Sequence, residues 1–263
     1  MRRDGTIIDD AREAAHALGI LLRQAERIVA FTGAGISTEC GVPDFRSPGS
    51  PWLVNKPIPF DAFVASEAVR REAWRRKFAM DDHAAGASPG RGHAALVRLW
   101  EAGRLRAVVT QNIDGLHHAS GLPTDAIIEL HGNGTYATCL TCGLRHELAD
   151  LRHAFEAEGA APTCVACDGA VKSATISFGQ PMPAEAMWRA HRAAADSDLF
   201  VAIGSSLVVY PAARLPLQAS DAGATLVILN REPTPLDAAA SLVLRCDIGP
   251  VLEAASAQAL SGR

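Results

Sequence analysis

The sequence predicts an α/β fold: a Rossmann-like parallel sheet with helices on both faces, plus a small inserted cysteine-rich module and a helical and loop insertion. Three observations lead to this class. Short apolar runs alternate with segments of helical periodicity, which is typical of a parallel sheet. Polar or glycine-containing clusters follow several of these runs. Two cysteine pairs stand apart in residues 136–172.

The bulk composition is that of an ordinary globular protein. The chain has 263 residues, of which 48% are hydrophobic and 21% charged, and its net charge is −4. This balance supplies no overall basic field, so we expect no direct sequence-specific binding of nucleic acid. We interpret the basic cluster between Arg70 and Lys77 as a solvated helix face.

No apolar run approaches the ~20 residues that span a membrane, and the N-terminus has no apolar signal region. The sequence therefore predicts a cytoplasmic protein with no membrane partner. In that compartment cysteines point to metal binding or catalysis rather than to disulfides.

The first half of the chain predicts three helices, a strand and an irregular loop. Residues 10–25 carry apolar side chains on one helical face. The apolar run 28–31 stops at a glycine turn, as a buried strand does. Residues 41–60 contain five prolines and should form an irregular loop, and residues 61–80 should form a helix. A further helix over 93–102 follows a Pro-Gly breaker.

The remaining strands are predicted from apolar runs further along the chain. These runs are residues 107–109, 126–128, 199–203, 226–229 and, more weakly, 242–244. We therefore predict a discontinuous nucleotide-binding domain of residues 1–40, 86–135 and 173–263. The insertion would comprise residues 41–85 and the cysteine module residues 136–172.

Polar clusters follow five of the predicted strands. They are Gly33-Ala34-Gly35-Ile36-Ser37, Thr110-Gln111-Asn112-Ile113-Asp114, His131-Gly132, Gly204-Ser205-Ser206 and Asn230. The carboxyl ends of parallel strands meet at one rim, so these groups should converge on one ligand site. Gly33-x-Gly35 suits either a phosphate near backbone N–H groups or a plain tight turn. No acidic residue follows at the spacing of a hydride-transfer dehydrogenase.

Several of these side chains are candidates for chemistry. His131 could be a general base, with an ordinary pKa near ~6.5. A lone histidine at a strand end is more often structural, but the place of His131 beside four other strand-end clusters favours the functional interpretation. Gln111, Asn112 and Asp114 could bind ribose hydroxyls and a carboxamide, or could form an Asx-type turn. The loop Asp44-Phe45-Arg46 reads either as a lid over a charged, ring-bearing ligand or as a turn with an ion pair.

The cysteine pairs predict one structural zinc ion. Their positions are Cys139, Cys142, Cys164 and Cys167, and residues 143–163 separate the pairs. Four thiolates complete a tetrahedral zinc site and leave no position for a reacting water, so the module would be a zinc ribbon and catalysis must lie elsewhere. We interpret the remaining cysteines, Cys40 and Cys246, as packing thiols.

Taken together, the motifs identify a family. The clusters above occur in the order found in sirtuins, NAD-dependent protein lysine deacylases, which the chain resembles from about residue 20 to about residue 250. Four further motifs contribute to the resemblance: Gly41-Val42-Pro43-Asp44-Phe45-Arg46-Ser47, Gly115-Leu116-His117, Phe178-Gly179-Gln180 and Leu207 after the Gly204 cluster.

The resemblance implies where NAD binds. The phosphates and riboses would meet the Gly33 and Gly204 clusters, the adenosine end would lie near Asn230 and Asp247, and nicotinamide near Ile113, Asp114 and Phe45. The implied NAD-binding residues are Gly33, Ala34, Gly35, Ser37, Asp44, Phe45, Arg46, Gln111, Asn112, Ile113, Asp114, Gly204, Ser205, Ser206, Asn230, Arg231 and Asp247.

The resemblance also implies a reaction. The amide oxygen of an acyl-lysine attacks the ribose carbon as nicotinamide leaves. His131 then acts as base on a ribose hydroxyl, and Asn112 orients the ribose or a water. The products are free lysine, nicotinamide and O-acyl-ADP-ribose, and deacetylation is the expected activity. The substrate peptide of an acylated protein would add as a strand along Phe178, Gly179 and Val208.

Two departures and two alternatives complete the expectations. Gln180 stands where the family usually has an acid, and the segment after the last cysteine pair lacks the usual proline. Residues 61–80 contain no tyrosine, so the Tyr-x-x-Arg pair of succinyl-removing members is absent and we expect uncharged acyl groups to be preferred. One alternative is mono-ADP-ribosylation, in which the same NAD chemistry is directed at a protein side chain. The other is a non-catalytic NAD-sensing zinc-ribbon module.

Overall fold

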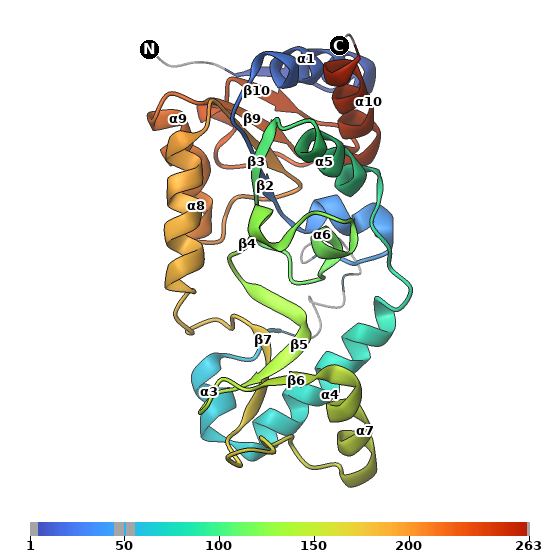
Figure 1. Cartoon of the computed structure of the whole chain (residues 1–263), viewed down its shortest axis with the longest axis vertical. Coiled ribbons are helices and arrows are strands. Elements are labelled where there is room, and N and C mark those ends of the chain that lie inside the picture. The colour runs from blue at the N-terminus through green and yellow to red at the C-terminus, as the bar shows by residue number, and fades with distance from the viewer. Residues whose placement is uncertain (1–4, 45–49, 51–55, 262–263) are drawn as a thin grey trace.

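The computed structural model describes residues 5–44, 50 and 56–261. Figure 1 shows a larger part built on one sheet and a smaller part that contains a second sheet. The first long helix and the last one pack side by side at the far end of the larger part. No helix among the described residues combines the length and apolar character needed to cross a bilayer.

The larger sheet has seven strands in the order β1-β10-β9-β8-β2-β3-β4, and every neighbouring pair is parallel. Its strands are β1 (Thr6–Ile8), β2 (Ile28–Thr32), β3 (Leu105–Thr110), β4 (Ile127–Glu129), β8 (Leu199–Ile203), β9 (Thr225–Leu229) and β10 (Leu242–Leu244). The six predicted strands are thus confirmed. Edge strand β1 was not predicted, because Ile7 and Ile8 are its only apolar residues and Asp9 and Asp10 follow them directly.

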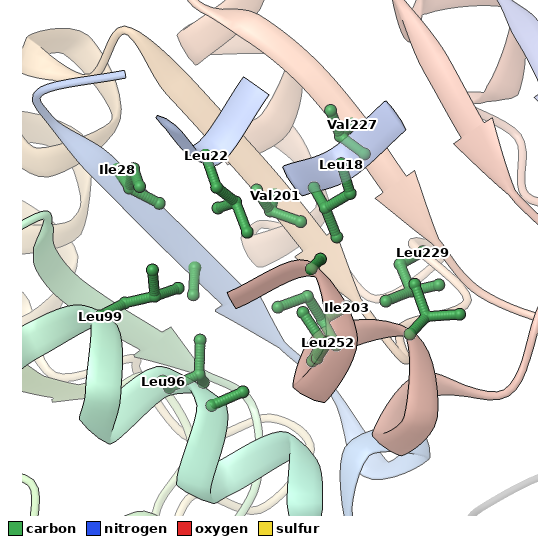
Figure 2. Packing of buried hydrophobic residues seen from close by; sticks show 14 of the residues in the cluster. Leu18, Leu22, Ile28, Leu96, Leu99, Val201, Ile203, Val227, Leu229 and Leu252 are labelled. Atoms are coloured by element: carbon green, nitrogen blue, oxygen red, sulfur yellow. The ribbon is translucent and has the colours of Figure 1, made fainter. Parts of the chain in front are cut away.

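Helices cover both faces of this sheet, as predicted. One face packs against α1 (Ala11–Gln24), α5 (Arg91–Glu101) and α10 (Ile248–Leu260), and the other against α8 (Ala184–Asp196) and α9 (Leu215–Asp221). Figure 2 shows the first of these cores, where Leu18, Leu22, Leu96, Leu99 and Leu252 of the helices meet Ile28, Val201, Ile203, Val227 and Leu229 of the strands. Since β2 and β8 are buried along their whole length, they read as unbroken apolar runs.

The helical insertion contains two helices instead of the single predicted one. They are α3 (Phe60–Ala65) and α4 (Glu67–His83), and Ser66 between them is extended, with φ −140° and ψ 126°. The Ser66 hydroxyl accepts a hydrogen bond from Val69 N at 3.4 Å, so it caps α4 as serine commonly does at a helix start. The prediction of one helix over 61–80 was therefore wrong at this residue.

The smaller sheet is antiparallel, in the order β6-β5-β7. Its strands are β5 (Gly132–Cys139), β6 (Arg145–Glu147) and β7 (Val171–Thr175), and helix α7 (Leu148–Glu158) follows β6. Trp74 and Phe78 of α4 share a core with Leu151 and Val171, and Trp74 Nε1 donates to Val171 O at 3.1 Å. The helical insertion and the cysteine module are thus packed together.

Short helical segments lie mainly at strand ends. They are η1 (Ala34–Cys40), α6 (Leu116–Ala119), η2 (Thr124–Ala126), η3 (Ala212–Arg214) and η4 (Asp237–Ala239). Segment η1 follows β2 and α6 follows the Asn112–Asp114 loop after β3, so both lie where the predicted ligand site should be.

Candidate active site

A cavity of about 1510 Å³ opens at the carboxyl ends of the large sheet. Its walls come from the loops after β2, β3, β4, β8 and β9, and from α4 and β7 of the smaller part. Sites for small ligands usually enclose roughly 300–1,000 Å³, so this cavity has room for a large ligand together with a second molecule. The predicted convergence of strand-end clusters is confirmed.

The loops after β2 and β8 touch at glycine residues. Gly33 N donates to Ile203 O and Gly35 N donates to Gly204 O, both at 2.9 Å. A Cβ atom on Gly35 would lie 2.6 Å from Gly204 Cα. The glycines therefore permit close contact between two backbones, and these two N–H groups are engaged within the protein instead of pointing at a ligand.

His131 lies in the cavity wall as a neutral imidazole. Its Nδ1 lies 3.1 Å from Gln111 O. A carbonyl oxygen only accepts, so Nδ1 carries the proton and donates a hydrogen bond to that oxygen. Burial lowers the pKa of His131, and the bond to Gln111 O opposes this shift. The remaining nitrogen, Nε2, is then an unprotonated acceptor, which is the form that a general base requires.

A chain of side-chain hydrogen bonds supports Asn112. Asn112 Nδ2 donates to Ser37 Oγ at 3.2 Å, and Ser37 Oγ donates to Asp114 Oδ2 at 2.7 Å. The other carboxylate oxygen of Asp114 accepts from Leu116 N at 2.9 Å and so caps α6. This chain fixes the orientation of the Asn112 amide, which faces the cavity.

Three further contacts organise the rim. Gln111 Nε2 donates to Ser205 Oγ at 2.7 Å and links the loops after β3 and β8. At the far end, Arg231 and Asp247 form an exposed ion pair at 3.7 Å. Asn230 Nδ2 donates to Glu232 O at 2.7 Å.

Most of the residues named from the sequence line this one cavity. They are Gly33, Ala34, Gly35, Asp44, Gln111, Asn112, Ile113, His131, Phe178, Gly179, Gly204, Ser205, Ser206, Asn230, Arg231 and Asp247. Ser37 and Asp114 lie behind Asn112 in the hydrogen-bond chain, and Val208 is exposed beside the cavity-lining Val209. Phe45 and Arg46 lie outside the described residues.

The structure also places charged residues in the wall that sequence reasoning missed. Arg76 and Lys77 of α4 line the cavity, where the sequence suggested only a solvated helix face. Lys172 of β7 is 4% exposed, and burial lowers the pKa of its amine to about 8. Because these positions depend on how the smaller part packs onto the larger one, no local sequence pattern signals them.

The four predicted cysteines form one cluster in the smaller part. Their sulfur atoms all lie within 4.8 Å of one another. Cys139 Sγ accepts hydrogen bonds from Cys142 N and Thr141 N, which lower the pKa of this thiol and favour the thiolate that binds metal. The cluster supplies the complete donor set of a structural Zn²⁺ site. The other two cysteines differ: Cys246 is buried and Cys40 lies 3.9 Å from His93 Nδ1.

Comparisons with known proteins agree with this site. The Sir2 family model matches residues 33–211. The NAD-dependent protein deacetylase 1 of Bradyrhizobium diazoefficiens is 57% identical, over 94% of this chain and 96% of that protein. The NAD-dependent protein deacetylase of Rhodopseudomonas palustris is 58% identical, over 89% of this chain and 93% of that protein.

The fold agrees as well. A Sir2 variant solved with a deacetylated p53 peptide and 3′-O-acetyl ADP-ribose superposes with a TM-score of 0.82. It is 34% identical, and the match covers 91% of this chain and 96% of that chain. The matched family model, the high identity of these relatives over nearly their whole length and the shared fold lead to one conclusion: the chain belongs to the Sir2 family of NAD-dependent protein deacylases.

Proposed function

We propose that this chain removes acyl groups from lysine side chains of proteins, with NAD as co-substrate and His131 as the general base. The observation that carries the proposal is the neutral His131 in the wall of the strand-end cavity, with Nδ1 held by Gln111 O. Such a group can accept a proton from a ribose hydroxyl once nicotinamide has left. The ribose oxygen then bonds to the acyl carbon, and one water molecule adds there as the carbon–nitrogen bond breaks, which releases the free lysine and leaves O-acyl-ADP-ribose.

Different parts of NAD would bind to loops at the ends of different strands. We assign the phosphates and riboses to the loops that begin at Gly33 and Gly204, and the adenosine end to Asn230, Arg231 and Asp247. Asn112, fixed by Ser37, would orient the nicotinamide ribose or a water. These assignments are supported by the shared cavity and by the order of the strand ends around it.

Exposed apolar side chains at the edge of the cavity suit the binding of an extended peptide. Phe178 is 63% exposed and Val208 is 42% exposed, although both are apolar. Phe178 O accepts a hydrogen bond from Phe60 N at 2.9 Å, which ties this segment to the start of α3. We assign the acylated substrate to a strand-like position between these two segments, where backbone contacts would give affinity.

Uncharged acyl groups remain the proposed substrates. Two cations of α4 in the cavity wall already have partners: Arg76 Nε lies 2.6 Å from Glu72 Oε1, and Lys77 pairs with Asp81. Lys172 donates to Thr175 O. A carboxylate at the end of an acyl chain would have to compete with these partners, which favours acetyl and other neutral chains.

The test is product analysis with NAD and an acetyl-lysine peptide. Wild-type protein should release nicotinamide and O-acetyl-ADP-ribose, and His131→Ala should form the latter about 10²–10⁴-fold more slowly. His153→Ala, which removes an exposed histidine of α7, is the matched control and should retain full activity. Label from the adenine-side phosphate retained on protein, without O-acetyl-ADP-ribose, would instead indicate mono-ADP-ribosylation and overturn the proposal.

A further inference from the structure

Glu129 is a half-buried carboxylate two residues before His131. It is the last residue of β4 and pairs with Thr110 in the sheet register. Its side chain is 21% exposed, although a lone carboxylate at a strand end would gain from full hydration. The roles assigned above to the strand-end clusters do not account for it.

Two donors from different segments meet at one oxygen of this carboxylate. Asn133 Nδ2 donates to Glu129 Oε1 at 2.7 Å, and His118 Nε2 donates to the same oxygen at 3.2 Å. Asn133 is 5% exposed, and its own oxygen accepts from Thr135 N at 2.8 Å. Hydrogen bonds to an ionised carboxylate are stronger than bonds between neutral groups, so Glu129 holds Asn133 and His118 firmly together.

The first bond closes a turn that has His131 at its centre. Residues 129 and 133 are linked by side chains, and the backbone between them passes through Gly132 at φ +70°. Among the described residues, the imidazole itself has one hydrogen bond, at 3.1 Å, to Gln111 O. The position of His131 therefore depends on how well this turn is held.

The second bond and a backbone contact carry the constraint to the other side of the site. His118 belongs to α6, whose first N–H is capped by Asp114. One residue beyond Asn133, Gly134 N donates to Ile113 O at 2.7 Å. Through these links the turn around His131 is attached to the loop that carries Asn112, Ile113 and Asp114.

We propose that Glu129 is a positioning residue for the acyl-transfer half of the reaction, because its carboxylate fixes the turn that carries His131 against the Asn112–Asp114 loop. The proposal rests on the proposed function. Burial raises the pKa of Glu129, while the bonds from Asn133 and His118 act in the opposite direction and favour the charged form. A displacement of about 1 Å at a reacting group can cost ~10²-fold in rate.

The experiment separates the two halves of the reaction. Exchange of labelled nicotinamide into NAD, in the presence of an acetyl-lysine peptide, reports the step before His131 acts. Formation of O-acetyl-ADP-ribose at saturating substrates reports both steps. Glu129→Ala should slow the formation of O-acetyl-ADP-ribose by about 10–100-fold, and should change nicotinamide exchange and the KM for NAD by less than about threefold.

Three variants control for a general loss of structure. Glu129→Gln keeps an oxygen that can accept from Asn133 and should retain at least about a third of wild-type activity. Asn133→Ala removes the other half of the bond and should reproduce the selective defect. Glu147→Ala alters the last residue of β6, whose carboxylate pairs with Arg145 Nε at 2.8 Å. Glu147 does not line the cavity, so this variant should leave both rates unchanged.

The outcomes are distinct. Parallel loss of exchange and acyl transfer in Glu129→Ala and Asn133→Ala, or wild-type rates in both variants, would overturn the positioning role. If Glu129→Ala does not fold, the other two variants decide: a selective acyl-transfer defect in Asn133→Ala together with an active Glu129→Gln supports the positioning role, and equal behaviour of the two overturns it. A wild-type protein that forms no O-acetyl-ADP-ribose would overturn the proposed function itself, which is measured first.

Discussion

At His131, two influences act on one imidazole in opposite directions. Burial lowers the pKa, because the charged form loses hydration, and the Gln111 carbonyl raises it by accepting from Nδ1. The net shift is downward, so the imidazole is neutral at physiological pH. The carbonyl thus leaves Nε2 as the free nitrogen of the proposed base, and burial keeps that nitrogen unprotonated.

This environment predicts the pH dependence of catalysis. Protonation of Nε2 removes the base, so the rate of O-acetyl-ADP-ribose formation should fall as the pH drops through the pKa of folded His131, which lies below the ordinary value of ~6.5. The measurement is kcat from pH 5 to 8 at saturating NAD and peptide, beside nicotinamide exchange at the same pH values. A midpoint above pH ~6.5 for acyl transfer, or an identical acid limb for exchange, would contradict the assignment.

At the scale of elements, the contact between the loops after β2 and β8 shapes the end of the cavity to which we assign NAD. Gly204 has φ +62°, and a Cβ there would lie 2.6 Å from Ile36 N and 2.7 Å from Gly35 Cα. These neighbours are backbone atoms, which cannot move aside as a flexible side chain can. The contact therefore depends on glycine in both loops.

Gly204→Ala should force the two loops apart. We expect the KM for NAD to rise by at least about tenfold and the melting temperature to fall by several degrees, as a clash between packed backbones requires. Both are measurable by initial rates and thermal unfolding.

Gly103→Ala is the matched control. Gly103 has a similar φ of +69°, but a Cβ there meets nothing within 4 Å. This variant carries the backbone strain without the clash, so it should lose stability while the KM for NAD stays at the wild-type value. Equal effects of the two substitutions on the KM would show that strain alone, and not the loop contact, accounts for the change.

The scale of elements also separates what the sequence could predict from what it could not. Strands β2 and β8 were predictable because burial on both faces requires unbroken apolar runs. The break at Ser66 was missed because its extended conformation interrupts a helical pattern that runs on both sides. Within the site, the place of His131 in the cavity wall was predictable from its position after a strand, beside four other strand-end clusters. Glu129 and Lys172 were not, because their significance lies in partners and packing that only the folded chain brings together.

At the scale of the whole molecule, the cavity belongs to both parts of the structure. The larger part supplies the strand ends, whereas α4 and β7 of the smaller part supply the opposite wall. The core of the smaller part is modest, and it includes Cys139 and Cys164 beside Trp74 and Val171. The metal cluster is therefore part of what holds the opposite wall in place.

Removal of zinc should consequently unfold the smaller part and leave the larger one folded. Structural zinc contributes roughly 10–16 kcal/mol of binding free energy in small domains, more than a core of this size can replace. After chelation, or in Cys164→Ala, hydrogen exchange measured by mass spectrometry should show loss of protection across residues 132–175. Protection in β2 and β8 should persist, because their core contains none of the four ligands. Deacylation should stop, since one wall of the cavity is lost.

Cys246→Ala removes a buried cysteine outside the cluster and should keep both protection and activity. Simultaneous loss of protection in both parts would show that they unfold as one unit, and full protection of residues 132–175 without zinc would show that the metal is dispensable.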